Sequence, residues 1–263
     1  PEKVVNLFKF AATEVREILA SLGFKSVNEI IGRTDLLSQV NKGASNLDDL
    51  DLNPLLVQAD PGENPRYCKD RHINKVPDTL DEKIWSDIKK TVDPNKKNNF
   101  EYEIENTSRS VGTRLSHHIY KTYGNNKLPD NTINIKLTGS AGQSLGAFLT
   151  KGIKLTVEGD CNDYVGKGLS GGTIIVYPSS KNKLISNENT IIGNTVLYGA
   201  TSGKWSESGQ AGERFAVRHS GSLSVIEGCG ACWCEYMTGR IAIILWEVGD
   251  IFGAGMTGGM AFV

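Results

Sequence analysis

Long apolar runs are missing from this 263-residue chain, and so is an excess of charge of either sign. The longest apolar run, residues 241–246, is far too short to cross a bilayer, and no signal-like segment precedes the first expected helix. A net charge of −1, from 29 basic and 30 acidic residues, offers no basic surface for nucleic acid or an anionic membrane. We therefore expect a soluble protein, cytoplasmic or organellar, without nucleic-acid or membrane partners.

Cysteine is also scarce, with five residues in the chain, three of them at Cys229, Cys232 and Cys234. This number and spacing do not make a disulfide framework and indicate a reducing compartment rather than secretion. The chain starts at Pro1 without a methionine and stops inside an apolar run at Val263, so we expect a fragment of a longer protein.

Proline is nearly absent from the second half of the chain, where glycine is abundant. Residues 1–130 hold 6 of the 29 glycines and 7 of the 8 prolines, and Pro178 is the one proline beyond them. Two architectures are therefore expected to join near residue 130. We predict three parts: a helical and irregular linker over 1–75, an α/β lead-in over 76–130 and a glycine-rich β domain over 131–263.

The first part has helical periodicity at its start. Apolar residues recur every three or four positions from Val4 to Leu22, and Gly23 is placed to end this helix in a left-handed conformation. Ser26 and Glu29 have capping-box spacing, which predicts a short second helix closed near Gly32. In the lead-in we expect helices around residues 80–88 and 111–123 and a half-buried strand over 100–104.

Beyond residue 131 the helical period gives way to short β-branched runs separated by glycines. We predict strands at 133–137, 153–157, 173–177, 195–198, 223–226, 241–246 and 260–263. Short strands at intervals of roughly twenty residues, without helices between them, leave sandwiches, barrels and β-solenoids as candidates.

An internal repeat favours the solenoid. The residues Gly166, Gly168, Gly171 and Gly172 align with Gly253, Gly255, Gly258 and Gly259 at a constant offset of 87 positions. A weaker match at an offset of 69 implies one extra coil between Gly228 and Gly249. Corners of stacked coils meet about 4.8 Å apart, where glycine avoids both collision and the cost of positive φ. We therefore predict that these eight glycines are structural.

Several long stretches resemble one family closely. They are residues 139–148 (GSAGQSLGAF), 159–172 (GDCNDYVGKGLSGG), 209–218 (GQAGERFAVR), 234–239 (CEYMTG) and 253–263 (GAGMTGGMAFV), with 14–19 (EVREIL) and 31–37 (IGRTDLL) in the first part. They resemble the C-terminal glycine-motif (GXGXG) domain of the glutamate synthase large subunit and the link that precedes it. The resemblance covers nearly the whole chain.

The resemblance implies a fold and a role. The fold it implies is mainly β, a right-handed parallel β-helix preceded by a short helical and irregular region. The parent oxidoreductase converts glutamine and 2-oxoglutarate to two glutamates in nitrogen metabolism. It uses an amidotransferase domain and an FMN-binding synthase domain with an iron–sulfur cluster. In that family the glycine-motif domain packs against these domains and has a structural role, so we expect no catalytic, cofactor-binding or metal-binding residue in this segment.

Other motifs could suggest nucleotide or metal binding, but their surroundings in the sequence argue against both. The run from Gly166 to Gly171 satisfies the dinucleotide fingerprint, but an extended segment, not a helix, is expected after it. The cysteines at 229–234 lack a fourth metal ligand, and His117 and His118 point apart on their helix, so buried thiols and no metal are expected.

Two further groups of polar residues are also interpreted as structural rather than ligand-binding. Asp160 and Asp163 are interpreted as corner caps rather than calcium ligands. His219, beside Arg214 and Arg218, is interpreted as part of a solvated or salt-bridged face rather than an anion site.

The leading hypothesis is thus a non-catalytic module that holds the amidotransferase and synthase domains in place. One alternative is a stand-alone solenoid interaction subunit, similar to the glycine-motif subunit of formylmethanofuran dehydrogenase. Another is a carbohydrate-active β-helix, which would need a charged cluster on an outer groove. A strand edge left open at Val263 predicts self-association. The choice of NADH, NADPH or ferredoxin as electron donor is not encoded here.

Overall fold

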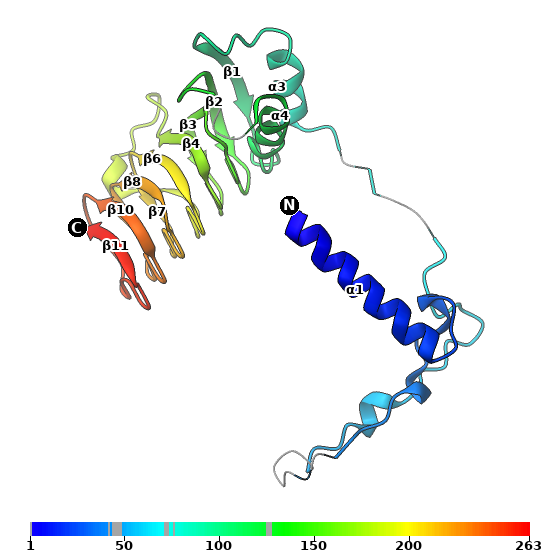
Figure 1. Cartoon of the computed structure of the whole chain (residues 1–263). Coiled ribbons are helices and arrows are strands. Elements are labelled where there is room, and N and C mark those ends of the chain that lie inside the picture. Colours follow the sequence, from blue (N-terminus) through cyan, green and yellow to red (C-terminus); the bar gives the residue numbers. More distant parts are fainter. Residues whose placement is uncertain (1, 42, 44–48, 71–73, 76, 125–127) are drawn as a thin grey trace. The chain divides into compact units, whose positions relative to one another are not determined.

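The computed structural model describes residues 2–41, 43, 49–70, 74–75, 77–124 and 128–263. The chain folds as two compact units, Pro1–Val76 and Pro77–Val263. Helices and irregular segments make up the first unit, and parallel strands make up most of the second (Figure 1). No helix among the described residues is long and apolar enough to cross a membrane.

The first unit begins with the predicted helix, α1 (Glu2–Ser21). Gly23 has φ +79° and ends it as expected, because the Phe24 N–H bonds the Leu19 carbonyl at 2.9 Å in a Schellman motif. The apolar side of α1 is uncovered within this unit: Leu19 is its one buried residue, whereas Phe8 is 71% exposed.

The second predicted helix is reduced to a single 3₁₀ turn, η1 (Val27–Glu29), so this prediction was wrong in length. The capping box does not form, because the Ser26 hydroxyl bonds the Glu29 carboxylate at 3.0 Å instead of a backbone N–H. Two more 3₁₀ turns follow, η2 (Thr34–Leu36) and η3 (Asn53–Leu56).

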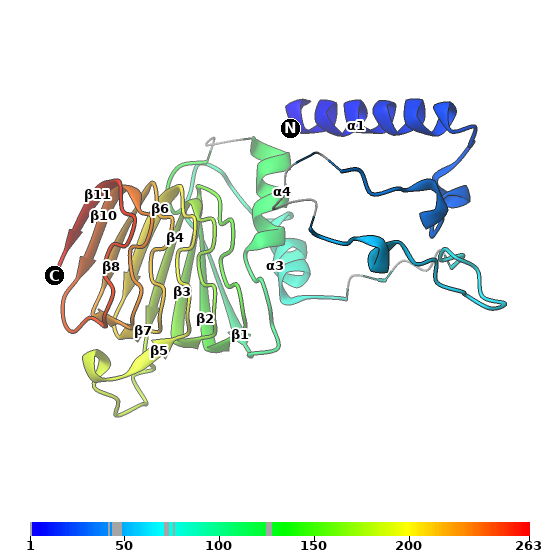
Figure 2. The ribbon, with the colours of Figure 1, turned by 90° about the horizontal axis from the view of Figure 1, so that it is seen from below.

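The second unit opens with the predicted lead-in elements: α3 (Leu80–Ile88), β1 (Asn98–Ile104) and α4 (Thr113–Tyr123). The helices lie at the end of the stack where β1 and β2 begin it (Figure 2). Ile84 and Leu115 are fully buried in the same core as the first strands. The two helices therefore close this end of the stack.

Asp81 joins the two helices. Its carboxylate is 3% exposed and accepts the backbone N–H groups of Gly112 at 2.6 Å, Arg114 at 2.8 Å and Leu115 at 3.2 Å. These are donors that the first turn of α4 leaves without partners in its own helix. A side chain of α3 thus caps α4 across the interface.

Ten more strands follow, and every pair of named strands is parallel. They are β2 (Ile133–Ala141), β3 (Ile153–Cys161), β4 (Ser170–Tyr177), β5 (Thr190–Ile192), β6 (Ser202–Glu207), β7 (Gln210–Ala211), β8 (Ser222–Ile226), β9 (Gly228–Cys229), β10 (Thr238–Ile244) and β11 (Gly258–Phe262). One side of the stack runs β1-β2-β3-β4-β6-β8-β10-β11, and a second side runs from the end of β3 through β5, β7 and β9. The fold is mainly parallel β and solenoid-like, as predicted.

The interior is filled by ladders of residues at the same position in successive coils. One ladder runs Leu137, Val157, Val176, Glu207, Ile226 and Ile244, and its neighbour runs Ile135, Leu155, Ile174, Trp205, Ser224 and Ala242. All are buried. In the second ladder the large Trp205 is followed by the small residues Ser224 and Ala242, which leave room for its indole.

The predicted strand at 195–198 is wrong. Thr195 and Leu197 have φ of +63° and +58°, so this segment is a left-handed corner, although its β-branched and apolar residues are typical of a strand. The prediction also missed the segments of β5, β6, β7 and β9. Three of these have two or three residues, and β6 (SGKWSE) is mostly polar.

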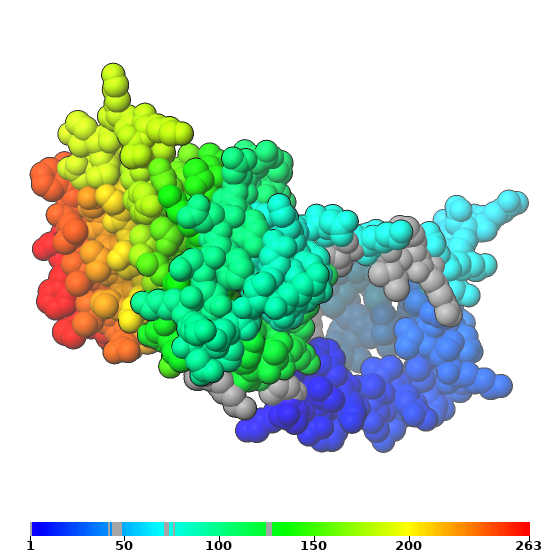
Figure 3. Space-filling view, turned by 90° about the horizontal axis from the view of Figure 1, so that it is seen from above, coloured from blue at the N-terminus to red at the C-terminus, as the bar shows by residue number. Residues whose placement is uncertain are grey.

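The spacing of the sequence repeat is set by the number of residues in each coil. Corresponding corner residues are 18 to 20 positions apart, except that Gly166 and Leu197 are separated by 31. Residues 178–189, with the turn η4 (Ser186–Glu188), account for the excess and project from the stack (Figure 3, yellow-green). Gly253 lies four coils beyond Gly166, and a bridge from Cys229 to Val248 marks the predicted extra coil.

Substituting Asp81 by alanine tests the cap between α3 and α4. It leaves three backbone donors near the core without their acceptor, so we expect a loss of about 2 to 3 kcal/mol in unfolding free energy. Denaturant titration measures this loss. Asp87→Ala on the same helix removes one exposed hydrogen bond to Tyr102 and should cost less than about 1 kcal/mol. Equal losses in the two variants would contradict the capping role.

Candidate functional site

The corner that contains the predicted glycines has an alternating conformation in six successive coils. Positive φ occurs at every second residue, giving three left-handed positions per coil. The first position is Ser144, Tyr164, Thr195, Arg214, Cys232 and Ile251; the second is Gly146, Gly166, Leu197, Ala216, Cys234 and Gly253; the third is Phe148, Gly168, Gly199, Arg218, Tyr236 and Gly255.

Hydrogen bonds connect these corners directly. The Tyr164 N–H donates to Asn194 O of the next coil at 2.9 Å, and the Gly166 N–H donates to Leu145 O of the preceding coil at 2.9 Å. The Gly168 N–H again donates forward, to Tyr198 O at 2.8 Å. The corner therefore continues the ladder of main-chain bonds around the bend, and the left-handed residues aim their N–H groups up and down the stack.

Four of the predicted glycines lie in this corner. A Cβ at Gly166 would lie 2.8 Å from the Leu197 side chain, and one at Gly253 would lie at an ordinary 3.6 Å from Met256. Gly168 and Gly255 lie against aromatic rings of the preceding coil. A Cβ there would lie 2.5 Å from the Phe148 ring and 2.7 Å from the Tyr236 ring.

The other four predicted glycines lie where each coil enters its next strand. Gly171 and Gly259 have positive φ, whereas Gly172 and Gly258 do not. A Cβ at Gly258 would lie 2.6 Å from the Thr238 carbonyl oxygen, which cannot move without breaking the coil.

Glycine is not obligatory at the corner, however. Leu197, Ala216 and Cys234 occupy the same position as Gly166, and each has φ between +56° and +58°. Each such residue costs about 1 to 2 kcal/mol relative to the right-handed conformation. The corner thus requires the left-handed conformation, and glycine supplies it at the lowest cost.

A second series of glycines was missed by the sequence analysis. Gly193, Gly212, Gly230 and Gly249 lie at the corner after the second side, at intervals of 19, 18 and 19 residues. A Cβ at Gly249 would lie 2.5 Å from the Ala231 nitrogen, so here successive coils approach through bare main chain. The regular interval was the signal that could have identified them.

Acidic and amide side chains cap this second corner. The Asp163 carboxylate accepts the Asn194 N–H at 2.8 Å, and the Asn194 side chain accepts the Glu213 N–H at 2.8 Å. The predicted capping role of Asp163 is confirmed. Asp160 instead accepts the Ser140 hydroxyl at 3.1 Å.

The dinucleotide fingerprint at Gly166–Gly171 leads into β4 (Ser170–Tyr177), which confirms the extended segment predicted after it. No helix N-terminus is therefore available there for a pyrophosphate. His118 stacks on Trp85 with 4.7 Å between ring centroids, and its ring meets that of His117 edge-on at 5.6 Å.

Glu207 is a single carboxylate in an otherwise aliphatic ladder. It lies between Val176 and Ile226, is 6% exposed, and neither carboxylate oxygen has a hydrogen-bond partner. Burial raises the pKa of Glu207 well above its usual range; the nearby Trp205 indole opposes this in part, and the charge of Glu227 adds to it. The protonated form of this side chain is therefore favoured in the folded state.

The prediction of buried thiols holds for two of the three clustered cysteines. Cys229 and Cys234 are buried, whereas Cys232 is half-buried, so the prediction was wrong for Cys232. Burial raises the pKa of the Cys229 and Cys234 thiols to about 12. A metal or iron–sulfur cluster needs thiolates, which these environments disfavour. Among the described residues, no group of three or more His, Cys, Asp or Glu side chains is placed to hold a metal ion. These residues do not fit a cluster site.

His219 is fully buried, so its predicted place on a solvated face is wrong, whereas Arg214 and Arg218 are exposed. Its Nε2 accepts the Ser222 N–H at 3.1 Å and lies 2.5 Å from the Ser222 hydroxyl, and Arg218 extends over the Tyr236 ring instead. Burial lowers the pKa of His219 to about 4. The imidazole is neutral and stabilises the turn from His219 to Ser222 by accepting the Ser222 N–H.

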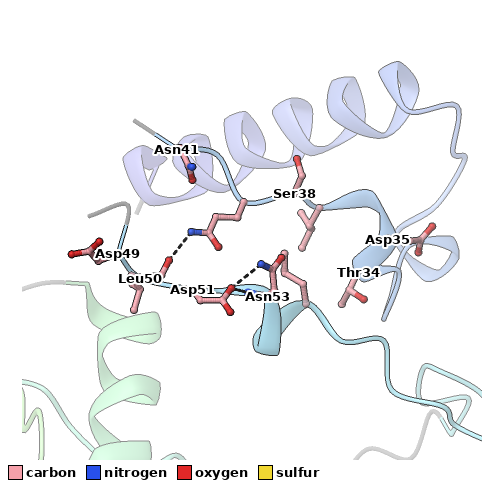
Figure 4. Close-up of a pocket in the computed structure, with 11 residues that line it drawn as sticks. Thr34, Asp35, Ser38, Asn41, Asp49, Leu50, Asp51 and Asn53 are labelled. Atoms are coloured by element: carbon pink, nitrogen blue, oxygen red, sulfur yellow. Dashed lines mark hydrogen bonds between the residues drawn. The ribbon is translucent and has the colours of Figure 1, made fainter. Parts of the chain in front are cut away.

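Each of the two units has hollows among its described residues, and those that carry several hydroxyl or carboxylate groups are described in turn. The first unit has a hollow of about 610 Å³ around Gln39, whose amide bonds Leu50 O at 2.6 Å and the Leu52 N–H at 2.8 Å (Figure 4). Of its acidic residues, Asp35 is paired with Arg33 at 2.8 Å and Asp51 accepts from Asn53. Two of the three carboxylates that line this hollow are therefore engaged with neighbouring side chains.

The second hollow is a groove of about 570 Å³ beside α4. Three of its hydroxyl groups donate to main-chain carbonyls: Thr113 to Ala147 at 2.8 Å, Ser116 to Gly112 at 2.6 Å and Ser170 to Gly168 at 2.7 Å. A hydroxyl whose proton is committed to a carbonyl is not activated by a base. These three hydroxyl groups are therefore engaged with the main chain.

The sequence profile of the family described as "GXGXG motif" matches residues 81–263 of this chain. The chain belongs to the GXGXG motif family. The match begins at the capping residue Asp81 and runs through the last strand, so it covers the helices that close the stack together with all of its coils.

Relatives of this GXGXG chain include the glutamate synthase [NADPH] large chain of Azospirillum brasilense, 62% identical over 93% of this chain. The glutamate synthase [NADH] of Schizosaccharomyces pombe and the ferredoxin-dependent glutamate synthase 2 of Synechocystis are 47% and 45% identical over its whole length. The chain spans 13 to 17% of the length of these relatives. The predicted resemblance to a fragment of glutamate synthase is confirmed.

The buried carboxyl of Glu207 predicts a pH effect on stability. Because its folded pKa lies above the unfolded value of about 4.5, the folded state is favoured most below that pH and loses stability as pH rises. The loss is at most about 1.4 kcal/mol for each pH unit. Glu207→Gln should remove this loss and be more stable than the wild type at neutral and alkaline pH. Thermal unfolding across pH measures it, with the exposed Glu213→Gln as matched control; a wild-type profile in Glu207→Gln would refute the assignment.

His219 predicts the opposite slope at acidic pH. Its folded pKa of about 4 lies below the unfolded value of 6.5, so its contribution to stability is complete above 6.5 and is lost as pH falls toward 4. The shift corresponds to roughly 3 kcal/mol at most. His219→Asn should flatten the profile between these two pH values in urea titrations. His117→Asn, on the surface of α4, is the control and should leave the slope intact.

Proposed function

We propose that this chain is the structural C-terminal domain of a glutamate synthase and holds the amidotransferase and synthase domains in place. The parent reaction would convert glutamine, 2-oxoglutarate and reductant to two glutamates. One observation supports this most directly: the inward side chains and corner N–H groups of the stack are used in coil-to-coil contacts. What the fold provides is a stiff stack with no convergent reactive groups in its described part.

The proposal extends to the architecture. We infer that the coils wind as a right-handed parallel β-helix, because connections between parallel strands are almost always right-handed. Residues 1–75 would be the link that leaves the synthase domain, 76–130 the lead-in and 131–263 the glycine-motif domain. The glycines at 166, 168, 171, 172, 253, 255, 258 and 259 would serve the stack alone.

The cofactors of the parent would lie elsewhere. FMN and the iron–sulfur cluster belong to the synthase domain in this proposal, in agreement with the raised thiol pKa values of Cys229 and Cys234. The partners of this segment would be the other domains of the same polypeptide, in a cytoplasmic or plastid enzyme. Identity to relatives across the first 75 residues supports this arrangement over a stand-alone subunit.

The purified 263-residue chain tests the proposal. We expect it to remain colourless after incubation with FMN and to release no ammonia from glutamine, since it would lack both active sites. Flavin fluorescence and an ammonia assay measure this, with a full-length relative as positive control. Stoichiometric flavin binding or glutaminase activity in the isolated chain would overturn the structural role.

A further inference from the structure

Three polar side chains of β6 and the next coil have buried atoms without hydrogen-bond partners among the described residues. Glu207 is 6% exposed, and both of its carboxylate oxygens are unpaired there. Trp205 is 1% exposed, and its indole Nε1 is unpaired as well. In the next coil, Glu227 Oε2 is buried and unpaired. Unpaired polar atoms are costly in a protein interior, so this concentration of them needs a physical explanation.

These side chains face the same region of the interior. Trp205 and Glu207 are two positions apart on β6, so both project from the same face of the strand. The parallel register pairs Ser206 with Val225, which brings Glu227 beside this end of β6. Burial raises the pKa of Glu207 most, but the Trp205 indole lowers it and the charge of Glu227 raises it. Both groups therefore lie near the carboxyl.

Small side chains surround the Glu207 carboxyl. On the second side of the same coil β7 contributes Ala211 to the interior, and Ala211 pairs with Cys229 of the next coil. Cys161 and Cys229 are each 6% exposed. Burial raises the pKa of both thiols most, and the charge of Glu207 contributes to the rise, so both thiols lie near it. The carboxyl thus has short neighbours on this side rather than large aliphatic ones.

The preceding coil is irregular at this level. Other coils turn the corner after the first side at a glycine, such as Gly159 with φ +151° and Gly209 with φ +143°. Between β4 and β5 this corner is replaced by the projecting segment 178–189. Val176, the last inward residue before that segment, pairs with Glu207. The carboxyl therefore takes an aliphatic position next to the one interrupted corner among these coils.

We propose that Trp205, Glu207 and Glu227 form an internal water-binding site, in which one ordered water molecule joins the coil of β6 to the coil of β8. The water accepts the Trp205 N–H and donates to a Glu207 oxygen and to Glu227 Oε2. This inference goes beyond the proposed function and does not depend on it.

The donors and acceptors of the site match a water molecule rather than an ion. The Trp205 indole is a donor only, whereas the unpaired carboxylate oxygens accept, and one water satisfies both kinds of group. Buried waters typically make about three hydrogen bonds to groups that are otherwise unpaired. A metal cation would be repelled by the indole N–H, and the described residues include no set of three or more His, Cys, Asp or Glu side chains placed to hold one.

Nuclear magnetic resonance and crystallography of the full 263-residue chain test the proposal. We expect a nuclear Overhauser effect between water and the Trp205 indole proton, whose resonance Trp205→Phe identifies. In the crystal, a solvent peak should lie about 2.7 to 3.2 Å from both Trp205 Nε1 and a Glu207 oxygen. Trp233 is the internal control, because its buried indole donates to Gly249 O at 3.3 Å and should show no contact with water.

Two substitutions at Glu207 form a matched pair. Glu207→Gln keeps an oxygen acceptor and nearly the same volume, so the water and its Overhauser effect should remain, whereas Glu207→Leu should abolish both. If the leucine variant does not fold, the wild-type measurement still decides. A direct hydrogen bond from Trp205 to Glu207 with no solvent between them would overturn the proposal. A metal ion at the site, or a water contact that persists in Glu207→Leu, would overturn it as well.

Discussion

Main-chain hydrogen bonding between successive coils is the constraint on which the rest of this molecule depends. The strands form these hydrogen bonds along two sides of the stack. At the corner that contains the predicted glycines, the alternating left-handed residues form them around the bend. Without this alternation the corner N–H groups would point into an apolar interior, where each unpaired group costs more than 1 kcal/mol. The backbone conformation of the corner is therefore more strictly maintained than the residue type that adopts it.

This distinction explains what could and could not be predicted from the sequence. The glycines at 166 and 253 revealed the repeat because glycine marks a left-handed position openly. Thr195 and Leu197 occupy the same corner two residues apart, but β-branched and apolar side chains are typical of strands, so this coil was misassigned. Local propensity fails where the ladder above and below decides the conformation.

The interior shows a similar limit. Aliphatic runs indicated which residues face inward, and most do so. Periodicity could not distinguish the buried His219 from a surface histidine, nor indicate that Glu207 takes an aliphatic position, because burial of a polar residue depends on contacts between coils far apart in sequence. The elements of the lead-in could be predicted from the sequence, because α3, β1 and α4 each have a complete apolar pattern within their own segment.

Because α3 and α4 close one end of the stack, its two ends are not equivalent. At that end Asp81 ties the helices together and the first coil is complete, so a coil added there would have to displace packed side chains. Because each coil contacts only its neighbours, a coil gained or lost farther along the stack would leave this helical cap intact. Variation in the number of coils is therefore compatible with the closed end only away from α3, α4 and β1.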